Sequence, residues 1–254
     1  MKTNQAGSAL ISVLVILLLI TIIGILAIRQ GLTNLNIATN SQVKSLLLQS
    51  SDYALQKIEV TANGNANSPV WTFLRQATNT GAEQTEFWSC YRPMSDTDYL
   101  RVQKASEVVA SATTTDSSAT VSTNTGLCDL TADFISPRKT AVTQLSVMQN
   151  RKSKEDIPFQ YAEKGSDTKQ YAEQPKLVTV YSTSILPGMA SSDISTIQSA
   201  CMQNRIADNL VRENSLKEGL GDCLARMGAP ATTQVQDFIL TALKVSTPNT
   251  GGTQ

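Results

Sequence analysis

The sequence contains few recognisable patterns of the residue types that usually carry out catalysis or bind metals. The chain has 254 residues and no histidine. This excludes the commonest general base, the commonest metal ligand, and any Ser-His or Cys-His catalytic pair. The four cysteines, Cys90, Cys128, Cys201 and Cys223, include no C-x-x-C pair of the kind that binds zinc.

The remaining candidates for chemistry are equally weak. Asp96 and Asp98 could contact a cation, but the Gly and Glu that complete a calcium-binding loop are missing after them. Neither a glycine-rich phosphate loop nor a G-x-S-x-G motif occurs. Because 21 basic residues balance 21 acidic ones without a basic cluster, the composition argues against a nucleic-acid partner. We therefore expect a protein that is not an enzyme and that binds no cofactor or metal.

The most distinctive stretch is apolar and lies near the N-terminus. Residues 9–28 are twenty uncharged positions, fifteen of them Leu, Ile or Val. As a helix they would span about 30 Å, the thickness of the hydrocarbon core of a bilayer. Each such side chain favours insertion by roughly 0.3 to 0.6 kcal/mol. We therefore expect a membrane-spanning helix over residues 8–28, flanked by Lys2 and Arg29.

The helical pattern continues beyond this stretch without a proline, over residues 29–60. Apolar side chains recur there at steps of three and four, which marks one face of a helix. These residues are Leu32, Leu35, Val43, Leu46, Leu47, Ala54 and Ile58. The sequence Asn63–Asn65 should end the helix. We expect the protein's own sheet to cover most of this apolar stripe.

Gly7 stands directly before the apolar run, at the end of a seven-residue leader with one lysine. The stretch from Gly7 to Gly24 resembles the N-terminus of type IV prepilins, in particular PilX-type minor pilins and K-type minor pseudopilins. The resemblance extends over about the first fifty residues. It implies that residues 1–7 are a leader, that prepilin peptidase cuts between Gly7 and Ser8, and that Ser8 becomes the methylated N-terminus.

The sequence departs from most pilins at two positions. Most mature pilins begin with Phe, where this chain would begin with Ser8, and most carry Glu at the fifth mature position, which is Ser12 here. In the family, that Glu pairs with the N-terminal ammonium of the subunit ahead. A charge in an apolar core is costly unless it is paired. A subunit that has no other subunit ahead of it therefore gains nothing from the Glu. The resemblance thus implies a position at or near the pilus tip.

The resemblance also implies a location and partners. The chain would be a single-pass inner-membrane protein with a periplasmic head, residues 61–254, and would later stand at the pilus tip on the cell surface. Its partners would be other minor pilins, the major pilin, a tip adhesin of the PilY family and prepilin peptidase. Its role would be to prime pilus assembly, in a system that serves twitching motility, DNA uptake or cell adhesion.

Three alternatives to the PilX type stay open. One is a K-type minor pseudopilin of type II secretion. The second is a plain signal anchor on a periplasmic protein of another function. The third is a cleaved signal peptide, although the apolar run is longer than the usual 7 to 15 residues.

The expected fold is α+β and pilin-like, with the long helix packed on an antiparallel sheet and a C-terminal helical segment. Residues 140–148 and 177–185 suit central strands because they are rich in residues that fit a pleated surface. We expect further elements at 70–74 (helical turn), 86–91 (strand), from 191–193 and from 215 (helices), and at 234–243 (helix or strand). The polar link 151–176 is a candidate contact loop.

An even number of cysteines in a periplasmic head predicts two disulfides. Four cysteines allow three connectivities. We favour the sequential pairing, Cys90–Cys128 and Cys201–Cys223, because each pair encloses a compact segment. Free buried thiols are the alternative.

Overall fold

The computed structural model describes residues 6–64, 68–79, 85–95, 99–100, 105–110, 119–123, 125–150, 176–207 and 218–240. The chain divides into two compact units, Met1–Leu46 and Leu47–Gln254, here called the N-terminal and the C-terminal unit. The elements, in order, are α1 (Ala6–Gly64), α2 (Pro69–Asn79), β1 (Thr85–Tyr91), β2 (Ser106–Ala110), β3 (Ala119–Val121), β4 (Val142–Gln149), β5 (Lys176–Ile185), η4 (Pro187–Met189), α3 (Ile194–Ile197), η5 (Gln198–Met202), α4 (Leu220–Arg226) and β6 (Ala231–Leu240).

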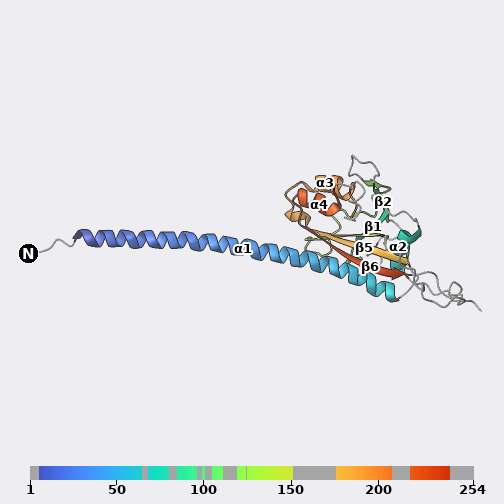
Figure 1. Cartoon of the computed structure of the whole chain (residues 1–254), viewed down its shortest axis with the longest axis horizontal. Helices are drawn as coiled ribbons and strands as arrows, with labels where there is room; N and C mark the ends of the chain where they lie inside the picture. The colour runs from blue at the N-terminus through green and yellow to red at the C-terminus, as the bar shows by residue number, and fades with distance from the viewer. Residues whose placement is uncertain are drawn as a thin grey trace, which may run out of the picture. The chain divides into compact units, whose positions relative to one another are not determined.

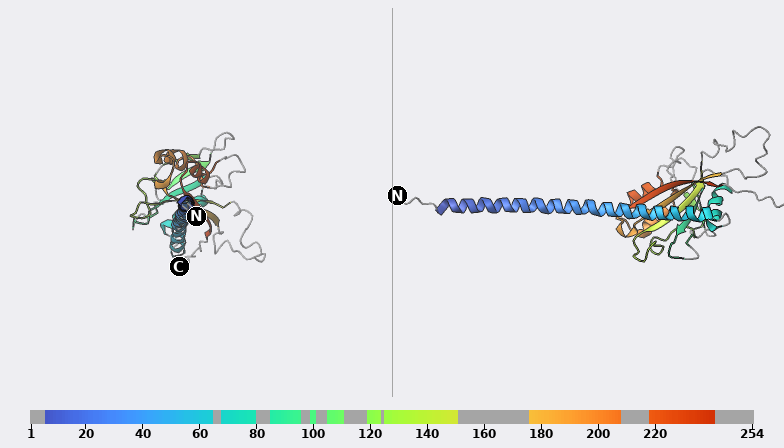
Figure 2. Two further views of the ribbon diagram at one scale, coloured as in Figure 1. Left: turned by 90° about the vertical axis from the view of Figure 1, so that its left-hand side faces the viewer. Right: turned by 90° about the horizontal axis from the view of Figure 1, so that it is seen from below.

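Helix α1 runs without interruption through 59 residues (Figures 1 and 2). No proline falls within it, and it ends at Gly64, where the sequence predicted the break. Threonine hydroxyls inside the helix bond back to carbonyl oxygens of the preceding turn, as Thr21 does to Leu18 at 2.8 Å. This bond satisfies a hydroxyl in an otherwise apolar segment.

The C-terminal unit is built on a six-stranded antiparallel sheet of order β3-β2-β1-β4-β5-β6 (Figure 1). The two expected central strands pair with each other from Val142 opposite Ile185 to Gln149 opposite Val178. All of β1 and nearly all of β4 are buried. They are buried on both faces because both faces of the sheet are covered, which confirms the predicted α+β arrangement.

The last turns of α1 in the C-terminal unit and helix α2 cover one face of the sheet. The predicted helical turn near residue 70 is an eleven-residue helix. The indole Nε1 of Trp71 donates to the carbonyl oxygen of Ala62 at 2.7 Å and joins α2 to α1. The buried apolar side chains of this layer are Ala54, Leu55, Ile58, Val70, Phe73, Leu74, Ala77, Phe87, Tyr91, Leu100, Leu145, Val147, Val178, Val180 and Leu240.

A buried set of hydroxyl groups lies between α1 and the central strands. Ser50 Oγ lies 2.6 Å from Thr143 Oγ1, and Ser184 Oγ lies 2.8 Å from Thr143 Oγ1. Ser51 Oγ donates to Ser184 Oγ at 2.9 Å, and Ser182 Oγ donates to the carbonyl oxygen of Ser51 at 3.1 Å. Small side chains let the helix backbone approach the sheet, and their mutual bonds avoid the cost of burying unpaired hydroxyls. We call these five residues the hydroxyl cluster.

The opposite face of the sheet is covered by α3, η5, α4 and the segment 125–141. Its buried apolar residues are Trp88, Cys90, Val108, Ala110, Ala119, Leu127, Cys128, Leu130, Val142, Met148, Tyr181, Ile185, Ile197, Cys201, Met202, Ile206, Ala207, Leu220, Cys223, Leu224 and Ala229. Asp193 caps α3, as expected, by accepting a hydrogen bond from the backbone N–H of Ser195. Gly228, two residues after the end of α4, has a positive φ of 65°, which glycine adopts without strain and which ends helices.

One expectation about the fold needs correction. The helical segment lies between β5 and β6 and not at the C-terminal end, because the ambiguous stretch near residue 234 is strand β6, the last described element. The sequence of β6 lacks a clear strand pattern because apolar side chains lie on both faces of the strand. Val235 and Ile239 share one face, and Phe238 packs on the other.

The apolar stripe of α1 is covered over most of its positions, as expected. Leu47, Ala54 and Ile58 are buried and Val43 and Leu46 are half-buried, whereas Leu32 and Leu35 are 58% and 62% exposed. Of the candidate contact loop 151–176, all but Lys176, the first residue of β5, lies outside the described residues, as do Asp96, Asp98 and Ser215.

Candidate functional sites

The first candidate site is the apolar segment of α1. Every large apolar side chain from Leu10 to Ile28 is at least 46% exposed, the value for Ile22. Helix α1 is the one helix of the described residues that is long and apolar enough to cross a membrane, as judged by length and composition. So much exposed apolar surface would be costly in water. The segment is thus compatible with a membrane anchor.

Gly7 and Ser8 lie in the first turn of this helix, directly after its first residue, Ala6. Ser12 follows in the same helix, four residues after Ser8.

The four cysteines form two disulfides in the C-terminal unit. Cys90 of β1 is bonded to Cys128, with their Cα atoms 4.8 Å apart, and Cys201 of η5 is bonded to Cys223 of α4, with Cα atoms 5.6 Å apart. This is the sequential pairing that the spacing favoured.

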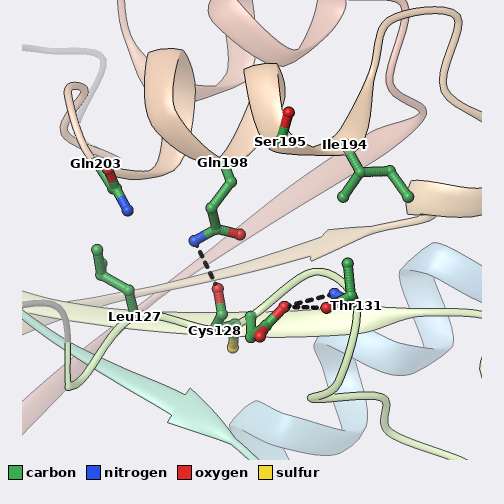
Figure 3. Close-up of a pocket in the computed structure, with 8 residues that line it drawn as sticks. Leu127, Cys128, Thr131, Ile194, Ser195, Gln198 and Gln203 are labelled. Atoms are coloured by element: carbon green, nitrogen blue, oxygen red, sulfur yellow. Dashed lines mark hydrogen bonds between the residues drawn. The ribbon is translucent and has the colours of Figure 1, made fainter.

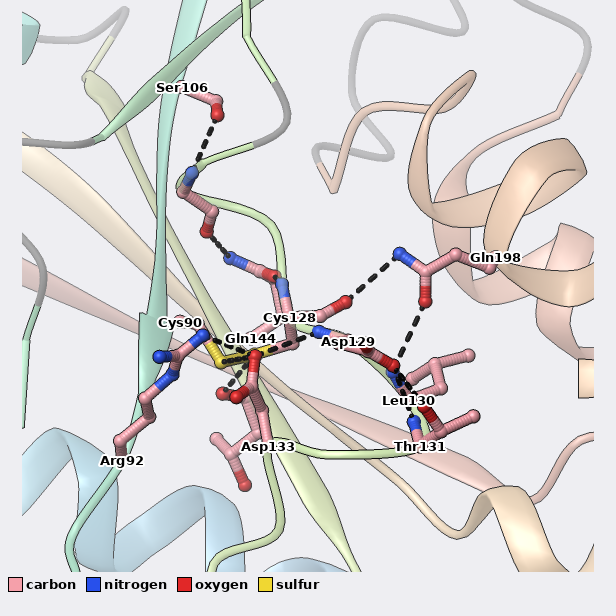
Figure 4. Close-up of polar contacts among 12 residues, drawn as sticks. Cys90, Arg92, Ser106, Cys128, Asp129, Leu130, Thr131, Asp133, Gln144 and Gln198 are labelled. Carbon is pink, nitrogen blue, oxygen red and sulfur yellow. Dashed lines mark hydrogen bonds and ion pairs between the residues drawn. A yellow bond between two sulfur atoms is a disulfide. The ribbon is translucent and has the colours of Figure 1, made fainter. Parts of the chain in front are cut away.

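The segment around Cys128 is held by side chains from two elements (Figure 4). From β4, Gln144 Oε1 accepts from the N–H of Cys128 at 2.7 Å and Nε2 donates to the carbonyl oxygen of Gly126 at 3.2 Å. From η5, Gln198 Nε2 donates to the carbonyl oxygen of Cys128 at 3.0 Å and Oε1 accepts from the N–H of Leu130 at 3.2 Å. Buried backbone groups that no strand reaches are thus satisfied by amide side chains.

An ion pair fixes the end of the same segment. The guanidinium of Arg92, just after β1, donates to the carboxylate of Asp133, which also accepts from the N–H of Asp129 at 2.9 Å. Asp129 in turn accepts from the hydroxyl and the N–H of Thr131, at 2.6 and 2.8 Å. These bonds favour the ionised form and lower the pKa of Asp129 below its usual value.

This segment and the α3–η5 helices enclose a groove of about 400 Å³ (Figure 3). It is lined by Leu127, Cys128, Asp129, Thr131, Ile194, Ser195, Gln198 and Gln203. A volume of this size suits a small ligand or a few residues of a peptide. The lining contains one carboxylate, two amides and two hydroxyls, and Gln198, Thr131 and Ser195 also form hydrogen bonds within the protein. Within the described residues no three His, Cys, Asp or Glu side chains are grouped so that they could hold a metal ion.

Sequence reasoning missed the groove and its supporting contacts. The nearest signal was the favoured pairing of Cys90 with Cys128, and that disulfide and the Arg92–Asp133 pair join the two stretches. Nothing in the sequence linked Gln198 to Leu130, which stands 68 positions earlier.

Comparisons with known proteins give no further assignment. No protein-family model matches the sequence, and neither a curated protein nor a solved structure shows significant similarity to the chain.

Proposed function

We propose that this chain is a PilX-type minor pilin that stands at or near the tip of a type IV pilus. The observation that carries the proposal is the Gly7–Ser8 junction at the start of one unbroken helix. That helix is apolar and exposed over its first half, and from Leu47 it is packed on an antiparallel sheet.

The chemistry of such a subunit is structural. Before assembly the apolar segment of α1 would anchor the chain in the inner membrane, with the C-terminal unit in the periplasm. In a pilus the same segment would leave the lipid and pack against the helices of neighbouring subunits. Leu32 and Leu35, which are exposed, would add to that helix bundle.

Ser12 supports the placement at the tip. An ionised Glu at this position would be expensive in an apolar surrounding unless an ammonium group lay beside it. A serine avoids that cost in a subunit that has no neighbour ahead. The other minor pilins, the major pilin and a PilY-family adhesin would then contact the chain from below and above.

The N-terminus of the native protein tests the class of protein. Mass spectrometry of the membrane-extracted chain should find N-methyl-Ser8 in cells with prepilin peptidase and an intact leader in cells without it. Gly7→Leu should block the cut. The control Gly24→Leu should not, because a side chain at Gly24 meets nothing within 4 Å. An intact Met1 in wild-type cells, or a cut near Ala27, would refute the proposal.

Position in the pilus needs a second experiment. Ser12→Glu should reduce incorporation or move the subunit away from the tip, whereas Ser12→Ala should behave as wild type. Immunogold labelling of sheared pili gives the readout. Normal incorporation of Ser12→Glu along the shaft would contradict tip placement. A processed chain whose loss stops type II secretion and leaves pili intact would instead identify a K-type pseudopilin.

A further inference from the structure

Strand β6 ends the sheet in the part of the chain that the structure describes (Figure 1). It pairs with β5 over ten consecutive residues, from Ala231 opposite Ile185 to Leu240 opposite Lys176, without a bulge. The other edge strand, β3, has three residues. A long regular edge strand offers a row of backbone donors and acceptors to another chain.

The hydrogen-bond pattern shows which groups of β6 point away from the sheet. The N–H of Leu186 donates to the carbonyl oxygen of Pro230 at 2.9 Å, so this pair faces inward. In an antiparallel ladder, bonded and non-bonded pairs alternate. The even-numbered residues of β6 therefore bond to β5. The odd-numbered residues present their N–H and C=O groups to the open edge, and they are Ala231, Thr233, Val235, Asp237 and Ile239.

The side chains of the same residues make this edge selective. Val235 and Ile239 are 56% and 65% exposed, on the sheet face opposite α1. Asp237 lies between them, and its Oδ1 accepts from Thr179 Oγ1 at 2.6 Å and from Asn150 Nδ2 at 3.0 Å. No proline or lysine, the usual protection of an edge, occurs in β6. The edge thus carries two exposed apolar side chains around one fixed negative charge, the only charge of the strand.

We propose that the open edge of β6 binds an extended segment of another protein, which adds one strand to the sheet. Its backbone would bond to the outward groups of Val235, Asp237 and their neighbours. Charge complementarity sets its sequence, with a lysine or arginine facing Asp237 between apolar residues facing Val235 and Ile239. The inference does not depend on the proposed function, because it concerns only the C-terminal unit.

The first test is amide hydrogen exchange on the full chain in detergent, read residue by residue. Without a partner, the N–H groups of Val235 and Asp237 should exchange at least about tenfold faster than those of Gln234 and Gln236, because only the latter bond to β5. Equal protection of both sets would overturn the proposal. It would mean that this chain or a second copy already covers the edge, and the molecular mass from sedimentation separates these two causes.

The second test adds a short threonine-rich peptide with valine, lysine and isoleucine at alternate positions. It should slow the exchange of the odd-numbered amides at least about tenfold and leave the even-numbered ones unchanged. A peptide with glutamate in place of the lysine should protect them far less. If neither peptide changes the exchange, or both change it equally, the stated partner chemistry is wrong.

Two variants distinguish the loss of outward hydrogen bonds at the edge of β6 from the loss of the folded sheet. Val235→Pro removes an outward N–H without removing a bond to β5, so the sheet should persist while peptide binding falls about tenfold or more. Val235→Thr keeps the N–H and should weaken binding less, by about threefold. Equal binding by Val235→Pro and wild type, with the remaining even-numbered amides still protected, would exclude strand addition.

Discussion

At the residue scale, the hydroxyl cluster shows how polar side chains can hold a buried helix–sheet contact. Ser50, Ser51 and Ser184 are at most 7% exposed. Each hydroxyl has a partner within the cluster, so burial does not leave donors unpaired. Such bonds are directional, and they fix the position of α1 along the strands more strictly than apolar packing does.

Thr143→Val tests the cluster. It should lower the free energy of unfolding by about 1 kcal/mol, because Ser50 and Ser184 each lose a partner while their own 3.0 Å bond remains. Denaturant unfolding of the full chain in detergent, followed by tryptophan fluorescence, measures this. The control Thr120→Val, at an exposed position of β3, should stay within about 0.5 kcal/mol of wild type. Equal effects of the two substitutions would deny the cluster a stabilising role.

A second residue-scale feature is the carboxylate of Glu218 between two guanidinium groups. Its oxygens accept from Arg226 Nε at 2.7 Å and from Arg205 Nη2 at 3.2 Å. The hydrogen bonds from Arg226, and then those from Arg205, lower the pKa of Glu218 below its usual 4.5. The ion pairs link the chain after η5 to α4.

The lowered pKa predicts a pH dependence. The ionised form is favoured in the folded state, so its stabilisation is complete above the unfolded pKa and is lost as pH falls through the folded pKa. Glu218→Gln should therefore melt below wild type at pH 7, and the difference should shrink from about pH 5 downward. Thermal unfolding across this range measures it, with Glu59→Gln on α1 as the control. A difference that does not change with pH would mean that the ion pairs contribute nothing.

At the scale of elements, α1 joins an apolar segment to a packed one within a single helix. The packed part is defined by small and medium side chains that face the sheet, with Ala54 and Ile58 fully buried. Neighbouring positions such as Tyr53 and Gln56 are exposed. This alternation at helical spacing gives the packed part of α1 one face toward the sheet and one exposed face.

Ala54→Leu should disturb this contact. Adding three carbon atoms at a fully buried position costs about 1 to 3 kcal/mol, because α1 or a strand must move to make room. Gln56→Leu, on the same helix at an exposed position, should change the unfolding free energy by less than about 0.5 kcal/mol. Unfolding of both variants in the same detergent gives the comparison. If Ala54→Leu is as stable as Gln56→Leu, α1 is not closely packed at this position.

At the scale of the whole molecule, an apolar segment that serves as a membrane anchor should by itself hold the chain in the membrane. Leu18→Arg combined with Ile22→Arg should release much of the chain from the membrane, because each arginine near the helix centre costs about 2.5 to 3.5 kcal/mol. The matched pair Asn36→Arg and Asn40→Arg lies beyond the segment and should leave attachment intact. Extraction with alkaline carbonate gives the readout. Equal retention of both double variants would show that another part of the chain holds it to the membrane.

The sequence by itself determined the features that rest on local pattern. The apolar run and the break at Gly64 predicted α1, and the residues that suit a pleated surface predicted the central pair β4–β5. The spacing of the cysteines favoured the two disulfides that the structure contains. These signals lie within a few neighbouring residues, where periodicity and residue type decide the outcome.

Only the tertiary structure decided the rest. The groove joins Asp129 to Ile194, and the hydroxyl cluster joins Ser51 to Ser184, 133 positions away. The nature of β6 as a strand depends on its pairing with β5, since polar and apolar side chains are mixed on both of its faces. Such contacts depend on which distant surfaces meet when the sheet is covered on both sides. No local period in the sequence predicts these contacts. The free energy that stabilises them comes from burying side chains of segments that lie far apart in the chain.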